Sequence, residues 1–429
     1  DLYKASQVTN GSTKKTTTAT STKKGSSWSN SAYKASQIKN GSTKKSTAQV
    51  KIEKKSGSSD TVSKLIGWGS TVSKTVKVYV EKAGSVWDSI KKLQERGVKI
   101  VMDVDDAYWH IDKTHPSYYA NVKNGIPEKV RETMKIVDWV TTTTPIFAKE
   151  IRKYNKNVFV SPNGIDPDIE QFKSKKEPSK NGKIRFGFVM GSSHEPDMNI
   201  MAGNFQKIIN SDIMDKIELH LCGYDLRGTT TVYNADGSVT QRPIKPDETV
   251  WHRFELMVTD NYNPKVVSPE YKKFLEMNIP DAEYPGIENE GYVRQWTRDV
   301  DHYCTHYNTV DVLLVPLRES VFNSCKSQLK LLEAGFMDTA VVCSNFGPYT
   351  IDTIPLIEHG GAINQEGNVI LIDEAKNHKD WAKSVIRLAK NPELITMLRE
   401  NLAKTIKPRY NMEELSRQRA EFYKSIVSL

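Results

Sequence analysis

The sequence has little cysteine and no long apolar run, and each shortage excludes a class of protein. The four cysteines, Cys222, Cys304, Cys325 and Cys343, lie far apart and form no CxxC pair, which argues against a zinc site and a disulfide framework. We therefore expect reduced thiols in a core, as is typical of intracellular proteins. No stretch of eighteen apolar residues occurs, so no membrane-spanning helix is predicted. The sequence starts at Asp1 without Met or a signal-peptide pattern, which fits a processed or trimmed amino terminus.

The charge of the chain is unevenly distributed. The formal net charge is +9, and residues 1–60 hold twelve Lys against Asp1, Glu53 and Asp60. This tail therefore carries the whole excess, and residues 61–429 are balanced. Because a basic excess is the usual electrostatic mark of nucleic-acid binding, we expect no nucleic-acid partner for the folded part. A chain of 429 residues is long enough for about two or three domains.

The tail also repeats itself. Tyr3–Lys15 reads YKASQVTNGSTKK, and Tyr33–Lys45 reads YKASQIKNGSTKK thirty residues later. Such a segment has too few apolar side chains to offset the entropy of ordering, which predicts a disordered or added low-complexity leader. The alternative is a tail that binds an assembly partner or an anionic surface, as repeated strands do along their neighbours in a phage virion. The expected location is cytoplasmic, or the virion if the chain comes from a phage.

Strand and helix patterns alternate from residue 77 to residue 166. We expect strands at 77–82 and 99–106 and an amphipathic helix at 85–97, and the segments 127–137, 138–144, 145–155 and 158–166 continue the alternation. Gly97 is well placed to close the first helix. This alternation is typical of an α/β domain with a parallel sheet.

The stretch DVLLVPLRESVFNSCKSQLKLLE, residues 311–333, is the most informative part of the chain. The apolar run 312–315 predicts a strand buried on both faces, and Pro316 ends it. We expect a helix from Ser324 on that keeps Lys326, Ser327, Lys330 and Glu333 available for polar contacts. Ligands of doubly wound sheets lie where strand carboxyl ends meet helix amino ends, and phosphate groups bind there. Taken alone, these residues fit solvated helix positions equally well.

This segment resembles the donor-binding segment of GT-B glycosyltransferases, and in particular of retaining family 4. The resemblance rests on a strand, Pro316, a short loop and a Lys-Ser-x-x-Lys-x-x-Glu helix that is followed by Ala334 and Gly335. It implies that Glu333 holds the donor ribose. The acidic residue that the family carries eight positions earlier falls on Cys325, so the donor motif is divergent. The resemblance then implies that Lys326 takes over the diphosphate contact, or that activity is weakened.

Two further turns match the same family. Residues 183–191 predict a buried strand, and the loop Gly191-Ser192-Ser193-His194 can bring its backbone close to a diphosphate; Pro196 is suited to a helix start. The resemblance implies a donor contact for His194, three residues before Asp197, although a lone loop histidine is as often a surface residue. At 343–350, CSNFGPYT, it places Gly347 and Tyr349 near the nucleotide.

The strand that ends in Asp103, Asp105 and Asp106 allows three interpretations. An Asp-x-Asp pair can hold a divalent metal beside a nucleotide diphosphate, as in GT-A enzymes. The acids can instead cap the next helix. The third interpretation is a resemblance: DVDDAYW is similar to the acidic strand end of some GT-B amino-terminal domains, which faces the cleft between domains. We favour the third, with Asp105 and Asp106 as catalytic candidates beside His194 and Lys326, and with no metal ligands.

The expected fold is α/β, with two Rossmann-like doubly wound GT-B domains, the first truncated, behind a low-complexity tail. The expected boundaries are residues 1–60 for the tail, 61–180 for the shortened acceptor-side domain, 181–410 for the donor-binding domain and 411–429 for a terminal helix packed back on the first domain. Residues 224–300 look like an insertion that holds a hairpin and an aromatic satellite core, including Trp251, Tyr262, Tyr271, Tyr292, Arg294 and Trp296.

The resemblance implies a glycosyltransferase that moves a sugar from a nucleotide-sugar donor to an unidentified glycan, lipid or protein acceptor. It implies a retaining and metal-independent reaction without a cofactor, so that Mg²⁺ and Mn²⁺ are not expected. Cys325 and the shortened first domain favour an alternative, a structural or binding protein of a large assembly that keeps the fold. A metal enzyme that uses Asp103 and Asp105 is the third candidate.

Overall fold

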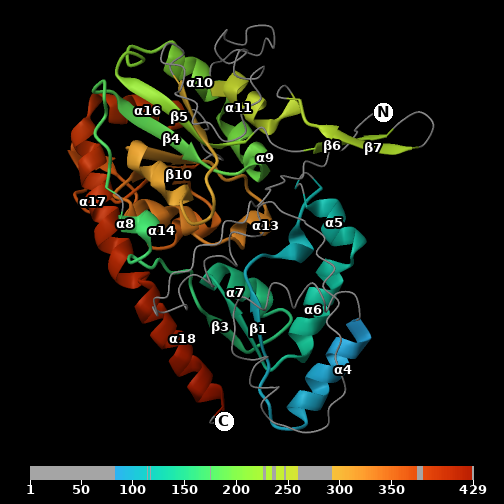
Figure 1. Ribbon diagram of the computed structural model, residues 1–429. Coiled ribbons are helices and arrows are strands. Elements are labelled where there is room, and N and C mark those ends of the chain that lie inside the picture. Colours follow the sequence, from blue (N-terminus) through green and yellow to red (C-terminus); the bar gives the residue numbers. More distant parts are fainter. Residues whose placement is uncertain are drawn as a thin grey trace, which may run out of the picture. The chain divides into compact units, whose positions relative to one another are not determined.

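The computed structural model describes residues 83–113, 115, 117–173, 175–225, 229–233, 238–245, 248–258, 292–373 and 380–427 (Figure 1). The chain divides into two compact units, residues 1–89 with 227–244 and residues 90–226 with 245–429. The repeat tail and the strand predicted at 77–82 lie outside the described residues. Among the described helices, none is both long and apolar enough to cross a membrane.

The first unit contains the predicted hairpin. Strands β6 (Thr229–Tyr233) and β7 (Val239–Pro243) pair antiparallel, with Thr231 opposite Gln241. The turn predicted between them, residues 234–237, falls outside the described residues. The two arms of the hairpin are confirmed.

A small parallel sheet organises the first domain, which begins in the second unit at residue 90. Strands β1 (Val101–Val104), β2 (Trp139–Thr142) and β3 (Val158–Val160) lie in the order β1-β2-β3. The accompanying helices are α4 (Ala83–Gln94), η2 (Tyr108–His110), α5 (Tyr118–Lys123), α6 (Ile126–Ile136) and α7 (Pro145–Ile151). Local sequence signals set their ends: Gly97, at φ +80°, follows α4, and Thr144 accepts a hydrogen bond from the Phe147 backbone N–H at the start of α7.

The core of the first domain contains side chains from a distant part of the sequence. Val104, Met134, Val140 and Phe147 are buried together, and Phe322 and Cys325 belong to the same cluster. Phe322 and Cys325 come from the segment that follows the apolar run 312–315. The hydrophobic interior of the first domain is therefore completed by the second domain.

The second domain is built on a six-stranded parallel sheet in the order β13-β10-β9-β4-β5-β8. When the six strands are numbered by their order along the chain and the sheet is read from β8 to β13, this is the order 3-2-1-4-5-6 of a doubly wound Rossmann sheet. Its switch point lies between β4 and β9. The strands are β4 (Ile184–Val189), β5 (Ile217–Tyr224), β8 (Tyr292–Trp296), β9 (Val312–Val315), β10 (Ala340–Ser344) and β13 (Ile370–Ile372).

Helices and short turns connect these strands. They are η3 (Ser192–His194), α9 (Glu195–Met198), η4 (Asn199–Met201), α10 (Ala202–Ile209), α11 (Val250–Val258), η6 (Tyr303–Thr309), α13 (Val321–Ser324), α14 (Leu329–Phe336), η7 (Gly347–Thr350), α16 (Asp380–Lys390) and α17 (Pro392–Arg409), with a small β11 (Glu358–His359) and β12 (Ala362–Ile363) pair. Helices α10 and α16 pack together beside β4 and β5 (Figure 1). All four cysteines are buried, as the sequence predicts.

The interval 224–300 is not wholly an insertion, and this corrects the prediction. Strand β8 pairs with β5 and forms one edge of the six-stranded sheet. Trp251 and Tyr292 belong to the main core of the second domain, so an aromatic satellite core was the wrong interpretation for them. Arg294 is buried and pairs with Glu255. Tyr262 and Tyr271 lie outside the described residues.

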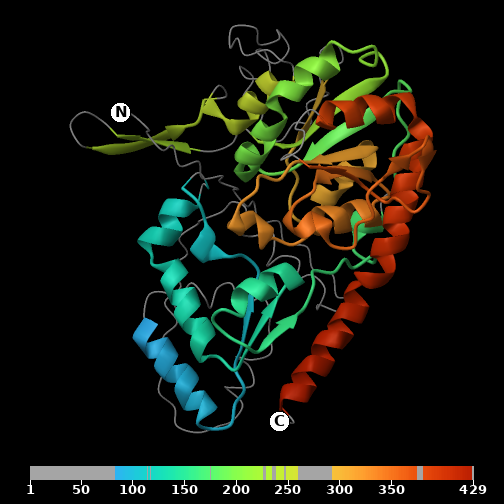
Figure 2. The ribbon, with the colours of Figure 1, turned by 180° about the vertical axis from the view of Figure 1, so that it is seen from behind.

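The chain passes between the two sheets twice. The outward passage runs from β3 to α8 (Glu170–Lys173), and the return leads from α17 into α18 (Met412–Val427). In Figures 1 and 2, α18 extends from the end of α17 alongside the β1-β2-β3 sheet. Phe422 of α18 stacks on Phe159 with ring centroids 4.1 Å apart, and Arg419 donates to the Ser161 hydroxyl at 2.8 Å. The terminal helix thus packs against the first domain.

Candidate functional site

The candidate site lies at the switch point of the six-stranded sheet. Three loops leave the carboxyl ends of adjacent strands there: the β4 loop (residues 190–194), the β9 loop (residues 316–328) and the β10 loop (residues 345–352). Ligands of doubly wound sheets bind outside such strand ends. The loops carry the predicted donor-binding residues Gly191, Ser192, Lys326, Ser327, Gly347 and Tyr349, while Lys330 and Glu333 lie on α14.

The β9 loop differs from its prediction in one respect. A helix was expected from Ser324 on, but α13 ends at Ser324 and α14 begins at Leu329. Two buried contacts hold the intervening residues in another conformation: Cys325 inserts into the core of the first domain, and the Gln328 amide donates to the Tyr410 hydroxyl at 2.8 Å. Lys326 and Ser327 therefore lie in the loop rather than on the helix.

The two lysines of this segment lie beside aromatic rings. The Lys326 ammonium is 5.3 Å from the centre of the Phe322 ring, and that of Lys330 is 5.5 Å from the centre of the Tyr303 ring. Ser327 accepts a hydrogen bond from the Asn163 amide at 2.8 Å. Each lysine retains N–H groups for a further acceptor, because an ammonium has three donors.

Glu333 is completely buried, and this corrects the expectation that it is available to a ligand. Its relative exposure is 0%. The carboxylate accepts hydrogen bonds from the Tyr303 hydroxyl, from the Tyr307 hydroxyl at 2.7 Å and from the Lys330 ammonium at 3.0 Å. A ribose hydroxyl can reach this carboxylate only where one of these groups gives way, and Tyr303 is the less buried of the two tyrosines.

The β4 loop positions His194 and leaves space around Gly191. His194 Nδ1 lies 2.8 Å from an Asp197 oxygen. A Cβ added at Gly191 would have no neighbour within 4 Å, so the backbone beside Ser192 faces open space. This is a local geometry in which a ligand can approach the main chain closely.

Asp197 joins the β4 and β9 loops. It is 3% exposed, and its other oxygen accepts from the Arg318 backbone N–H at 2.9 Å and from the Asn323 amide at 3.2 Å. Although burial opposes ionisation, the His194 hydrogen bond and the nearby Lys326 lower the Asp197 pKa. An ionised Asp197 must accept, so His194 donates from Nδ1.

The protonation state of His194 follows from its surroundings. Burial lowers its pKa; the Asp197 hydrogen bond opposes this, while Lys326 and Lys330 add to it. The neutral imidazole that results donates from Nδ1 and keeps an acceptor lone pair on Nε2. His194 can therefore accept a hydrogen bond from a ligand hydroxyl.

The β10 loop packs directly on the β9 loop. Gly347 has φ +55°, and a Cβ there would lie 2.9 Å from the Ser324 Cα, so a glycine is required. Tyr349 is buried, and burial, with Asp197 nearby, raises its pKa. Tyr349, His194, Asp197 and Lys330 line a cavity of about 20 Å³, which is room for about one water molecule. A ligand larger than a water molecule would therefore have to lie over these side chains rather than inside the cavity.

The structure adds His115 of the first domain, which the sequence analysis missed. Its Nδ1 accepts from the Ser117 backbone N–H at 3.1 Å, and its ring meets the Phe322 ring edge-on at 5.4 Å. Burial, with nearby Lys326 and His194, lowers its pKa to about 4, so neutral His115 presents an Nε2–H donor. A lone histidine between two regular elements gives no signal in the sequence.

The acidic strand end of the first domain lies near Cys325. Asp105 and Asp106 follow β1 and are half-buried. Burial raises the Cys325 pKa to about 11, and Glu150 and Asp106 contribute to the rise. Asp103 accepts a hydrogen bond from Thr141 on the neighbouring strand. Among the described residues, no group of three or more His, Cys, Asp or Glu side chains is arranged to hold a metal ion.

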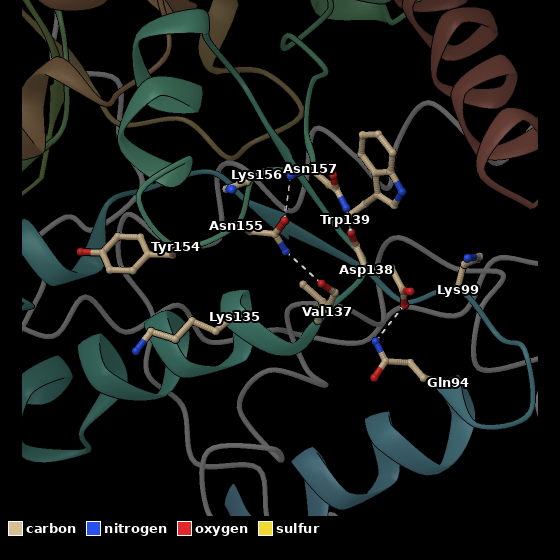
Figure 3. A pocket seen from close by; sticks show the side chains of 10 residues that line it. All are labelled: Gln94, Lys99, Lys135, Val137, Asp138, Trp139, Tyr154, Asn155, Lys156 and Asn157. Carbon is tan, nitrogen blue, oxygen red and sulfur yellow. Dashed lines mark hydrogen bonds between the residues drawn. The ribbon is translucent and has the colours of Figure 1, made fainter. Parts of the chain in front are cut away.

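A larger hollow lies at the opposite, amino-terminal edge of the small sheet (Figure 3). It measures about 600 Å³ and is lined by Gln94, Lys99, Lys135, Val137, Asp138, Trp139, Tyr154, Asn155, Lys156 and Asn157. Its polar side chains hold the strand ends together: Asp138 accepts from Gln94 and from the Ile100 N–H, both at 2.9 Å, and Asn155 donates to the Val137 carbonyl at 2.9 Å. The size of this hollow does not make it the candidate site, because the residues predicted from the sequence lie elsewhere.

Comparison with known proteins gives matches among solved structures. No protein-family model and no curated protein sequence matches the chain. Sucrose-phosphate synthase from Thermosynechococcus elongatus superposes with a TM-score of 0.52 at 14% identity, over 83% of this chain and 79% of that one. Anabaena Alr3699/HepE, solved with UDP and glucose, gives a TM-score of 0.50 at 12% identity, over 82% and 81% of the two chains.

Identities of this size establish the fold alone. Both structures align along most of their own length and along most of this chain. Together with the parallel three-stranded sheet and the doubly wound six-stranded sheet, they show that the chain has an α/β fold of the GT-B type, with two Rossmann-like domains of which the first is small.

Proposed function

We propose that the chain is a glycosyltransferase that binds a nucleotide-sugar donor over the switch point of its second domain. The observation that carries the proposal is the cluster of Lys326, Lys330, His194 and His115 beside the carboxyl ends of β4 and β9. His115 and Lys326 both contact the Phe322 ring, and His194 and Lys330 line one cavity. Two ammonium groups and a loop with open space around its backbone suit a diphosphate. The fold shared with sucrose-phosphate synthase and with Alr3699/HepE supports the same class of donor.

The chemistry assigned to these residues is charge stabilisation. When the bond between the sugar C1 and the diphosphate oxygen breaks, the bonding electrons leave with the diphosphate. Lys326 and Lys330 stabilise this charge, as preorganised donors do for a leaving group. The acceptor hydroxyl forms the new bond to C1 and gives its proton to the departing diphosphate. We propose that configuration is retained and that no metal ion takes part, so that adding EDTA leaves activity unchanged.

His194 and His115 have complementary roles in this proposal. His194 offers an acceptor at Nε2 and His115 a donor at Nε2, as their other hydrogen bonds require. The pair can hold a sugar hydroxyl from two sides, whereas a phosphate oxygen can accept only from His115. Asp105 and Asp106 are proposed to act on the acceptor side of the first domain.

The ribose contact proposed for Glu333 requires Tyr303 to move. The Tyr303 hydroxyl occupies one carboxylate oxygen, and a ribose hydroxyl would donate to the same atom. Binding therefore exchanges one hydroxyl donor for another, and the protein hydroxyl competes with the ligand.

Tyr303→Phe is expected to bind UDP about three- to tenfold more tightly than the wild type, because one competing hydrogen bond is removed. Isothermal titration calorimetry measures the change. The gain should be absent with 2′,3′-dideoxy-UDP, which has no ribose hydroxyls to donate. Tyr423→Phe, which removes a hydroxyl from α18, is the matched control. An equal gain for both nucleotides, or no gain for UDP, would contradict a ribose role for Glu333.

The lowered pKa of His115 predicts a loss of stability in acid. The unfolded chain takes up a proton at His115 near its ordinary pKa of 6.5, whereas the folded chain resists protonation down to about 4. The stabilisation is thus complete above pH 6.5 and is lost as the pH falls toward 4. In urea unfolding between pH 4 and 6.5, the free energy of unfolding should depend less steeply on pH for His115→Asn than for the wild type.

Burial is the main cause of the lowered His115 pKa, and the charges that face the ring modify it. Lys326 and His194 oppose its protonation, while Asp112 and Asp197 favour it. His302→Asn, at an exposed histidine paired with Asp299, serves as the control and should keep the wild-type slope. A wild-type slope in His115→Asn would show that other groups carry the acid sensitivity.

A structural or binding protein that keeps the fold is the second candidate. Cys325 stands where the resembled family has an acid, and it is buried in the core of the first domain. Glu333 is satisfied within the protein. Calorimetric titration with a panel of nucleoside diphosphates and their sugars, with and without Mg²⁺, decides between the two. Binding supports the enzyme, and no binding by a folded chain supports the second candidate.

A further inference from the structure

Tyr410 lies where the chain returns from the second domain to the first. It follows α17, and α18 begins two residues later. Its carbonyl accepts from the Ile165 N–H and the Met412 N–H donates to the Ile165 carbonyl, both at 2.8 Å. The two passages between the domains are therefore tied to each other by main-chain hydrogen bonds at this point.

The Tyr410 side chain extends from this junction to the candidate site. Its hydroxyl accepts from the Gln328 amide at 2.8 Å and donates to an Asp352 carboxylate oxygen. Gln328 ends the β9 loop and precedes α14, whereas Asp352 ends the β10 loop. Tyr410 and Gln328 are 5% and 2% exposed, so water does not replace these bonds easily.

Both loops have a second tie to the same junction. In the β9 loop, Ser327 accepts from Asn163 of the outward passage at 2.8 Å. In the β10 loop, the Asp352 side chain pairs with Arg409. The backbone carbonyl of Asp352 also accepts from the Asn368 amide at 3.2 Å.

The backbone of Asp352 shows that its position is imposed. Its φ is +56°, a conformation that residues other than glycine adopt at a cost. The contacts with Tyr410, Arg409 and Asn368 hold the residue in place. The end of the β10 loop is therefore fixed by the junction rather than by its own preference.

We infer that Tyr410 is a positioning residue, whose hydroxyl couples the junction between the domains to the β9 and β10 loops of the donor site. The inference rests on the proposed function for its ligand and deepens it. A displacement of the two passages would pull on Gln328 and Asp352 together. Lys326 and Tyr349 lie in these loops, so the geometry of the site depends on the junction.

Hydrogen–deuterium exchange on the full chain tests the coupling without any ligand. Tyr410→Phe keeps the ring and loses both hydrogen bonds. We expect amides in residues 325–332 and 347–353 to exchange about tenfold faster, while β4 and β5 keep their wild-type rates. Tyr423→Phe should change neither loop. Faster exchange throughout the domain, or faster exchange only beside residue 410, would overturn the inference.

A second variant separates coupling from general loss of stability. Gln328→Met keeps a similar side-chain volume but removes the amide that donates to the Tyr410 hydroxyl. Its effect on the β9 loop should therefore not add to that of Tyr410→Phe. Additive effects would overturn the coupling.

UDP affinity then tests whether the coupling through Tyr410 reaches the donor site. Tyr410→Phe is expected to weaken UDP binding about three- to tenfold, the scale of a lost buried hydrogen bond. If wild-type chain binds no nucleoside diphosphate, the proposed function fails while the exchange result still decides the coupling. If the wild type binds UDP and Tyr410→Phe binds it equally well, the coupling to the donor site fails alone.

Discussion

Replacing Lys330 by alanine is expected to lower the affinity for UDP about tenfold to a hundredfold. The ammonium lies at the carboxyl edge of the sheet, with its side chain 20% exposed, and a charged hydrogen bond to a phosphate contributes about 1.5–3 kcal/mol. Loss of that contact converts directly into this range of dissociation constants. Calorimetric titration of both proteins at one salt concentration measures the change.

The control for this experiment is Lys383→Ala. Lys383 is also a helix lysine paired with a carboxylate three residues away, Asp380, but it is exposed on α16. It should bind UDP as the wild type does. Equal affinity of the Lys330 variant and the wild type would exclude a diphosphate contact for Lys330, and an equal loss in both variants would indicate a non-specific charge effect.

The second large effect is on stability. Glu333→Ala is expected to lower the free energy of unfolding by about 3–5 kcal/mol, because it removes the buried carboxylate and leaves its hydrogen-bond donors without an acceptor. The three donors are Tyr303, Tyr307 and Lys330. Urea unfolding measures the difference. Glu128→Ala, at an exposed carboxylate paired with Arg131, should change it by less than about 1 kcal/mol.

This prediction affects how Glu333 can be tested. A Glu333→Ala protein that binds no nucleotide has lost either a ligand contact or its local structure, so the variant alone does not assign the ribose role. Tyr303→Phe keeps the carboxylate and gives the opposite sign for a ligand contact. A stability loss below about 1 kcal/mol for Glu333→Ala would contradict the hydrogen bonds to the two tyrosines.

The strands of the fold follow closely from the sequence where their apolar runs are continuous. The run 312–315 forms β9, and the strand predicted within 183–191 forms β4. Residues 292–296 also form a strand of this sheet, β8 at its edge, but their sequence, YVRQW, contains Arg294 and Gln295. Arg294 is buried in a pair with Glu255 of α11, and a pairing across that sequence distance leaves no local pattern.

The candidate site was predictable in position but not in its contacts. Gly191, His194, Lys326, Lys330, Gly347 and Tyr349 come together at the switch point, where strand topology places them. The burial of Glu333 depends on Tyr303 and Tyr307, which precede β9, and the insertion of Cys325 depends on the first domain. Such contacts between distant segments have no periodicity for the sequence to show.

The shared core of the first domain has a consequence for how the chain is made. Domains commonly fold in order as the ribosome releases them. Here Phe322 and Cys325 complete the interior of the first domain, and Phe422 of α18 covers Phe159. These partners are synthesised more than 150 residues later than Phe159. The nascent first domain therefore stays partly uncovered until α18 has left the ribosome, and a chain that stops short of α18 would carry an unfinished first domain.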